Sequence, residues 1–123
     1  MTVLIDSNCW IQYFFGSKKL GDVRRIIEAS NERILLSVVN LAEVYAIYLA
    51  KTPNEADEKI TFIRNRCELK EVNYQIAVLS AKLKKDHKLS TVDSIILATA
   101  KLNNAQLITT DKDFKDIQGV HLI

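Results

Sequence analysis

The fold class is decided by the segment VDSIILATAKL, residues 92–102. Apolar residues surround almost the whole circumference of the helix that its spacing predicts, so we expect a helix buried on more than one side. Short apolar runs predict strands at residues 2–5, 34–36, 107–108 and 120–123. Apolar strands that alternate with helices indicate a parallel sheet covered on both faces. The sequence therefore predicts an α/β fold, with a central parallel β-sheet flanked by helices on both faces.

Four further helices are predicted from apolar residues at helical spacing. They are marked by Leu20, Val23, Ile26 and Ile27, by residues 41–49, by Ile60, Ile63 and Cys67, and by Ile76, Leu79, Ser80 and Leu83. Asn73 is expected to cap the last of them. A length of 123 residues, with no internal repeat and no linker, predicts a single domain over residues 1–123.

Composition excludes several classes of protein. Hydrophobic residues make up 48% and charged residues 26% of the chain, with 3 Gly and 1 Pro, which is typical of a globular domain and not of a disordered or collagen-like chain. No apolar run approaches the ~20 residues that span a bilayer, and the N-terminus lacks the features of a signal peptide. We therefore expect a cytoplasmic protein with no membrane segment. The net charge of +2 is too small to indicate nucleic-acid binding by itself.

Three other features favour structural roles. Cys9 and Cys67 form no CxxC pair and have no nearby His, so buried free thiols are expected and a zinc site is not. The stretch WIQYFF at residues 10–15 cannot point inward throughout on one helix, so one or two of its residues are expected on a partner surface. The lysines near residue 85 predict a solvated helix face or a phosphate contact; they are Lys82, Lys84, Lys85 and Lys88.

Four carboxylates are predicted at strand ends or helix starts, namely Asp6, Glu43, Asp93 and Asp111. Asp6 follows the first strand, and Asp111 follows the strand at 107–108 after two threonines. Glu43 and Asp93 are expected in the first turns of their helices. Parallel sheets gather loops and helix N-termini at the carboxyl ends of their strands. The four acids are therefore expected at one edge of the sheet.

Each acid taken alone also fits a structural role. Capping boxes are predicted by three spacings, which are Ser90-x-x-Asp93, Asn40-x-x-Glu43 and Thr110-x-x-Asp113. Acids also suit the positive end of a helix dipole, so capping is the favoured interpretation of Glu43 or Asp93 in isolation. It fits Asp6 less well, because Ser7 is available to cap the next helix. The capping interpretation also fits Asp93 poorly, because a carboxylate in so apolar a helix needs a partner.

The acids considered together favour a metal site. Several carboxylates at one sheet edge would repel one another, and a divalent cation removes that cost. Neither His87 nor His121 lies near a strand-end acid in the sequence, so the ligands are oxygen atoms only. Oxygen ligands favour Mg²⁺ or Mn²⁺ over zinc.

Four blocks of the sequence match a known family in order along essentially the whole chain. They are VLIDSN at residues 3–8, NLAE at 40–43, VDSIILATA at 92–100 and LITTDKDF at 107–114. They resemble the four blocks of PIN-domain ribonucleases, and they look closest to the small VapC-type toxins of prokaryotic toxin–antitoxin pairs. Many relatives have Gly-Leu ahead of the third acid, where this chain has Lys88-Leu89. That departure is expected to affect a loop more than the chemistry.

The resemblance implies metal-binding and catalytic roles for Asp6, Glu43, Asp93 and Asp111, with supporting roles for Asn8, Thr110 and Asp113. It implies an endoribonuclease that uses Mg²⁺ or Mn²⁺ to hydrolyse RNA phosphodiester bonds. It further implies inhibition by a small cognate antitoxin protein and assembly as a homodimer.

Three alternatives remain open from the sequence. A PIN-domain nuclease of RNA processing and a non-catalytic RNA- or protein-binding module share the same fold, although the full set of four acids disfavours lost activity. A strand followed by Asp also opens haloacid-dehalogenase phosphatases, which need an acid two residues further on. Here that position is Asn8, which cannot donate the proton that general acid catalysis requires.

Overall fold

The computed structural model describes residues 1–29 and 31–123, and it confirms the predicted α/β fold. Five strands form one sheet in the order β3-β2-β1-β4-β5, and every neighbouring pair is parallel. The strands in the described part of the chain are β1 (Thr2–Ile5), β2 (Arg33–Ser37), β3 (Glu68–Lys70), β4 (Gln106–Thr109) and β5 (Val120–Leu122).

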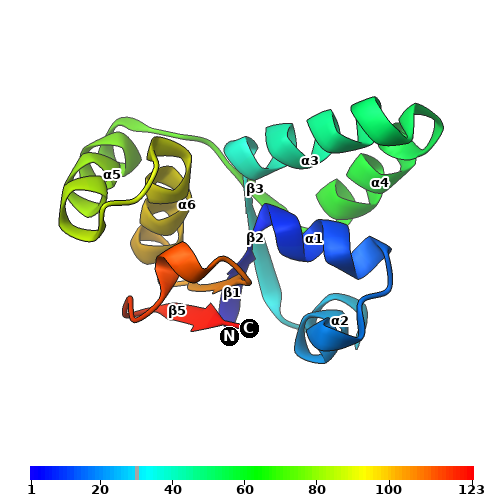
Figure 1. The fold of residues 1–123 in the computed structure, drawn as a ribbon, viewed down its shortest axis with the longest axis horizontal. Coiled ribbons are helices and arrows are strands. Elements are labelled where there is room, and N and C mark those ends of the chain that lie inside the picture. Colours follow the sequence, from blue (N-terminus) through cyan, green and yellow to red (C-terminus); the bar gives the residue numbers. More distant parts are fainter. Residues whose placement is uncertain (30) are drawn as a thin grey trace.

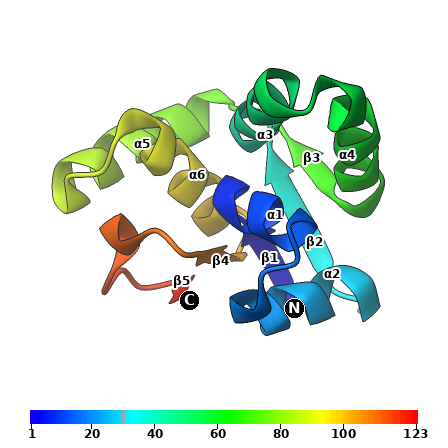
Figure 2. The ribbon, with the colours of Figure 1, turned by 45° about the vertical axis from the view of Figure 1, so that its right-hand side comes forward.

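Helices cover both faces of this sheet (Figure 1). One face is covered by α1 (Ser7–Phe14), α2 (Gly21–Ala29), α3 (Val38–Lys51) and α4 (Pro53–Arg66), and the other by α5 (Tyr74–His87) and α6 (Thr91–Leu102). Two short 3-10 helices, η1 (Lys18–Leu20) and η2 (Lys112–Phe114), complete the described elements. Figure 2 shows α5 and α6 together on one side of the sheet, and α3 and α4 together on the other.

Alternate residues of the central strands supply two separate cores, because side chains of a strand point to opposite faces in turn. Val3 and Ile5 pack with α1 to α4, whereas Leu4 packs with α5 and α6. In α6, buried positions run without a break from Ile96 to Ala100. The prediction of a helix buried on more than one side is therefore confirmed.

Two elements differ from the sequence-based expectation. Strand β3 was not predicted, because it has only three residues and two of them are exposed. It is held at the edge of the sheet by Arg33, whose guanidinium donates two hydrogen bonds to Glu68, at 2.6 and 2.8 Å. Helix α3 begins at Val38, three residues earlier than predicted. Glu43 consequently lies in the second turn, where the helix dipole no longer explains an acid.

Three of the predicted caps are wrong. Ser37, and not Asn40, caps α3 through a hydrogen bond from Val39 N. Asp6 caps α1 in place of Ser7, and Asp111 caps η2 in place of Thr110. In α1 and α3 the helix follows its strand so closely that it begins at or before the predicted cap, whereas η2 begins one residue later than predicted.

Two other predicted caps are confirmed. Ser90 Oγ accepts a hydrogen bond from Asp93 N, and Asn73 Oδ1 accepts one from Ile76 N. Lys88 is the C-cap of α5 and adopts the left-handed conformation, with φ 57° and ψ 39°. The departure from Gly-Leu therefore lies at a helix end, and its effect on the chemistry stays a prediction.

The expectation of buried cysteines is confirmed for Cys9, whereas Cys67 is half-buried. Cys9 and Cys67 are free thiols, and burial raises the pKa of each to about 12. In the stretch at residues 10–15, Trp10 is fully buried while Phe15 is 71% exposed. The four lysines of α5 and its C-cap are all exposed. None of the helices in the described part of the chain is long and apolar enough to cross a membrane.

Candidate active site

The register of the sheet brings the ends of β1 and β4 together. Leu4 pairs with Leu107 and Ile5 with Ile108, so the residues that follow these strands emerge side by side. Helices α3 and α6 add one acid each from the two faces. Together they enclose a cavity of about 300 Å³, lined by Asp6, Ser7, Asn8, Glu43, Asp93, Thr110 and Asp111. The structure thus places all four predicted acids in one cavity.

Asp6 is the most deeply buried of these acids, with 7% exposure. Its Oδ2 accepts a hydrogen bond from Thr109 Oγ1 at 2.7 Å, and its Oδ1 accepts one from Ser7 N at 2.8 Å. Asn40 Nδ2 donates a longer bond of 3.4 Å to the same Oδ1. These contacts hold the carboxylate in one orientation at the base of the cavity.

A chain of hydrogen bonds connects Asp6 with Glu43. Asn40 Nδ2 donates to Ser7 Oγ at 2.8 Å, and Ser7 Oγ donates to Glu43 Oε1 at 2.7 Å. Asn40 is fully buried and Ser7 nearly so. Because the hydroxyl has one proton, its donation to Glu43 fixes its acceptor side toward Asn40. The chain therefore sets the position of both carboxylates from within the core.

The acids that follow β4 and the acid of α6 form a close group. One carboxylate oxygen each of Asp93, Asp111 and Asp113 lies within 4.8 Å of the others. Asp111 N donates to Thr109 Oγ1 at 3.0 Å, and Asp111 Oδ1 accepts from Asp113 N at 2.9 Å. Asp113 thus lies closer to the predicted metal ligands than its supporting assignment implied.

Crowding of negative charge shifts the protonation of the site. Burial, together with the negative charges of Asp111, Asp6 and Glu43, raises the pKa of Asp93 to about 6. Burial also raises the pKa of Asp6, against the opposing effect of its hydrogen bonds from Thr109 and Ser7. Ionising both groups at neutral pH therefore costs free energy in the protein without a cation.

The donor set fits a hard divalent cation. Every titratable group that lines the cavity is a carboxylate, and the described part of the chain places no His or Cys among its lining residues. Carboxylate oxygens close enough to share one ion are the ligands that Mg²⁺ and Mn²⁺ prefer. A cation bound there would remove the repulsion that raises the pKa of Asp93.

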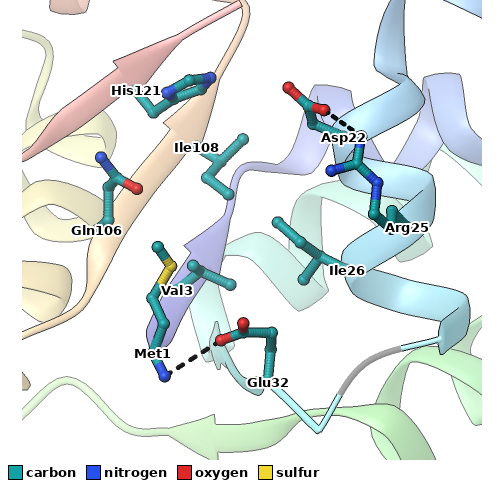
Figure 3. Close-up of a pocket in the computed structure, with 9 residues that line it drawn as sticks. All are labelled: Met1, Val3, Asp22, Arg25, Ile26, Glu32, Gln106, Ile108 and His121. Carbon is teal, nitrogen blue, oxygen red and sulfur yellow. Dashed lines mark hydrogen bonds and ion pairs between the residues drawn. The ribbon is translucent and has the colours of Figure 1, made fainter.

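A second cavity, of about 380 Å³, lies elsewhere and lacks this chemistry (Figure 3). Met1, Glu32 and Gln106 place it at the amino ends of the strands, opposite the acids. Its charges are paired, since the N-terminal ammonium contacts Glu32 at 3.2 Å and Arg25 contacts Asp22 at 2.6 Å. Although it is slightly larger than the acidic cavity, it offers no cluster of free polar groups for catalysis.

Sequence reasoning found the acids but missed the residues that hold them. Ser7 and Asn40 were interpreted only as helix caps, and Thr109 was not singled out. A signal for Asn40 was present, because a polar residue in the apolar segment VVNLAEV is expected to be buried and to need a hydrogen-bond partner. Thr109 offered no such signal, since threonine is common in strands.

Comparisons with known proteins agree with this geometry. The sequence model described as the PIN domain matches residues 3–120. A toxin–antitoxin complex from Klebsiella pneumoniae contains a chain of the same fold, with a TM-score of 0.81 and 27% sequence identity over 98% of this chain and 99% of that chain. Curated protein sequences gave no match.

Two more distant structures share the fold. VapBC2 from Rickettsia felis, bound to a DNA fragment from its promoter, has a TM-score of 0.79 at 18% identity, over 100% of this chain and 98% of that chain. VapC20 of Mycobacterium tuberculosis, a toxin that cleaves the sarcin-ricin loop, has a TM-score of 0.74 at 17% identity, over 94% of this chain and 95% of that chain.

Proposed function

The chain belongs to the PIN domain family, and from this premise we propose that it is an endoribonuclease dependent on Mg²⁺ or Mn²⁺. It hydrolyses phosphodiester bonds of RNA in the cytoplasm and acts as the toxin of a VapBC-type pair. The observation that carries this proposal is the single cavity lined by Asp6, Glu43, Asp93 and Asp111. Four carboxylates at one sheet edge oppose both stability and polyanion binding, and a divalent cation reverses both effects.

Residues of this chain would hold the cation from two sides of the cavity. Asp93 and Asp111 offer carboxylate oxygens close to each other, with Asp113 beside them. Asp6 lies buried at the base and Glu43 is exposed at the rim, and both are fixed by the hydrogen bonds of Thr109, Asn40 and Ser7. When bound, the metal lowers the pKa of a water molecule and stabilises charge on the leaving oxygen of the phosphodiester.

The protein contributes orientation to this reaction. The hydroxyl of Ser7 keeps Glu43 turned toward the cavity, and the hydroxyl of Thr109 links Asp6 with the backbone of Asp111. Because these carboxylates are already held in place, they lose little conformational freedom when the substrate reacts. Hydrolysis by water leaves the 2′ hydroxyl of the substrate unused, so the products carry a 5′ phosphate and a 3′ hydroxyl.

An antitoxin partner is supported by the solved relatives. The relative from Klebsiella pneumoniae was solved as a toxin–antitoxin complex and spans the same length as this chain. We propose a small cognate protein as the inhibitor of this chain, and a homodimer as its free form. Phe15, exposed beside the buried Trp10, is a candidate contact for either partner.

The experiment that tests this function compares two Asp-to-Asn variants on single-stranded RNA. Asp6→Asn is expected to reduce the cleavage rate by at least about 100-fold, since it removes a ligand of the metal. Asp86→Asn is the matched control, because Asp86 is exposed on α5 outside the cavity. Equal cleavage by both variants would contradict the assignment of the cavity as the active site.

A further inference from the structure

A second hollow borders the acidic cavity on the α1 side. This hollow of about 630 Å³ is lined by Asn8, Gln12, Lys19, Thr110 and Ile123. Asn8 and Thr110 line both spaces, and Asn8 Nδ2 donates to Thr110 Oγ1 at 3.0 Å. The two spaces therefore lie next to each other, with Asn8 and Thr110 between them.

Two polar side chains of this second hollow, Gln12 and Lys19, have no partner among the described residues. Gln12 is half-buried on α1, and its side-chain amide makes no hydrogen bond to any described residue. Lys19, on η1, is exposed and forms no ion pair with the residues that the structure describes. The amide of Gln12 is only half-buried, so water satisfies it in the free protein and a ligand can replace that water. Both groups are therefore available to a ligand.

The charges along this path are complementary to a nucleic-acid strand. The acidic cavity can take a cation and the scissile phosphate, whereas Lys19 is the only positive side chain among the described residues that line either space. A lysine binds backbone phosphate as a point charge. An amide such as that of Gln12 both donates and accepts, which suits the edge of an unpaired base.

We propose that the hollow lined by Gln12 and Lys19 is the subsite for the single-stranded RNA that flanks the scissile phosphate. Lys19 contacts a backbone phosphate one or two nucleotides away, and Gln12 contacts a base edge. Asn8 and Thr110 separate this subsite from the reacting group. The assignment rests on the proposed ribonuclease function and adds two positioning residues outside the acidic cavity.

Steady-state kinetics distinguish an RNA-binding role of Lys19 from a purely structural one. Lys19→Ala is expected to raise KM for a single-stranded RNA roughly 3- to 10-fold and leave kcat within about twofold, because one phosphate contact is lost. The slope of log KM against log salt should become shallower by about 0.7 for the same reason. Lys18→Ala is the matched control, since Lys18 is the exposed neighbour on η1 that does not line the hollow.

The role of Gln12 is tested by replacing its neutral amide with a negatively charged carboxylate. Gln12→Glu is expected to raise KM by more than Lys19→Ala, because a carboxylate in the path repels the strand. Gln118→Glu adds the same charge at an exposed position outside both spaces and should leave KM unchanged. Thermal unfolding checks that each variant is folded.

RNA binding is measured separately from cleavage. A wrong subsite can then be told apart from a wrong ribonuclease function. Fluorescence anisotropy of labelled single-stranded RNA is measured with Asp93→Asn protein, which the proposed function predicts to bind without cutting. In that background, weaker binding on Lys19→Ala but not on Lys18→Ala supports the subsite, even if the native protein does not cleave RNA. If the two lysine substitutions weaken RNA binding equally, or if neither weakens it, the subsite is wrong. Cleavage of RNA by the native protein remains the separate test of the proposed function.

Discussion

Thr109 is the residue through which two of the four carboxylates are coupled. Its hydroxyl donates to Asp6 Oδ2 and accepts from Asp111 N, and its side chain is fully buried. Thr109→Val keeps the shape but removes both bonds. We expect Mn²⁺ affinity to fall by about 10- to 100-fold and the free energy of unfolding without metal to fall by about 1–3 kcal/mol. Calorimetric titration and urea unfolding in EDTA measure the two effects.

A second buried threonine provides the control for this variant. Thr99 Oγ1 donates to Ile95 O within α6, away from the cavity. Thr99→Val should therefore leave Mn²⁺ affinity unchanged. Equal losses of affinity for the two variants would show that Thr109 acts through general stability and not through the carboxylates.

Asp93 distinguishes a metal site from a helix cap. As a cap in the first turn of α6, its charge would stabilise the helix by about 0.3–1 kcal/mol, and Asp93→Asn would lose that amount. In a crowded site the same change relieves repulsion, because Asp111, Asp6 and Glu43 raise the pKa of Asp93. We expect the variant to be at least as stable as the native protein at pH 7 in EDTA, and to lose most of the stabilisation by Mg²⁺. Loss of stability with normal cleavage would favour the cap.

The pH dependence follows from the same carboxyl group. Its pKa is about 6 in the folded protein against 3.8 in the unfolded chain, so the folded state binds the proton more tightly. The native protein in EDTA should therefore lose stability relative to Asp93→Asn as pH rises from 3.8 to 6, with no further change above. Mn²⁺ affinity should fall below pH 6, because binding requires the ionised carboxylate. Unfolding and titration series between pH 4 and pH 8 test both trends.

For single residues, the sequence predicted the four acids of the cavity but not the polar side chains that hold them. Acids directly after apolar strands are visible as a pattern, since strand order and parallel pairing determine where they emerge. Ser7, Asn40 and Thr109 act through contacts between positions 33 to 103 residues apart. Such contacts depend on how the layers pack, which local patterns do not specify.

Among the secondary-structure elements, the end of α5 is the clearest target for stabilisation. Lys88 adopts φ 57° there, a conformation that costs a side-chain residue more than glycine. Lys88→Gly is expected to raise the free energy of unfolding by about 0.5–1 kcal/mol, with RNA cleavage unchanged because Lys88 lines neither cavity. Urea unfolding measures the change.

The comparison for that variant is Lys85→Gly, one turn earlier in the same helix. Lys85 lies within the right-handed part of α5, so glycine there should cost about 1 kcal/mol. A loss of stability in both variants would show that the left-handed residue is not strained.

The elements differ in how much of them the sequence determines. Helix α6 and strands β1 and β4 were predicted because their apolar runs are long or uninterrupted. Strand β3 was not predicted because it is short, largely exposed and without an apolar pattern, and its partner strand β2 is distant in the sequence. The early start of α3 was not predicted because Val38 and Val39 suit either a strand or a helix.

For the whole molecule, the choice of cation is the next test. Ca²⁺ is expected to raise the melting temperature, since it also binds carboxylates of the native state. It should nevertheless support little cleavage, because its looser coordination orients water and phosphate poorly. Thermal unfolding and RNA cleavage with Ca²⁺, Mg²⁺ or Mn²⁺ make the comparison. Cleavage that requires Zn²⁺ and depends on Cys9 or Cys67 would contradict the oxygen-ligand site.

The central claim is that carboxylates and a divalent cation activate water against an RNA phosphodiester. Its most direct test is the chemistry of the product ends after the purified protein cleaves a single-stranded RNA with Mg²⁺ or with EDTA. We expect products with a 5′ phosphate and a 3′ hydroxyl in Mg²⁺, and no cleavage in EDTA. Ends that carry 2′,3′-cyclic phosphate, formed equally well in EDTA, would contradict the claim.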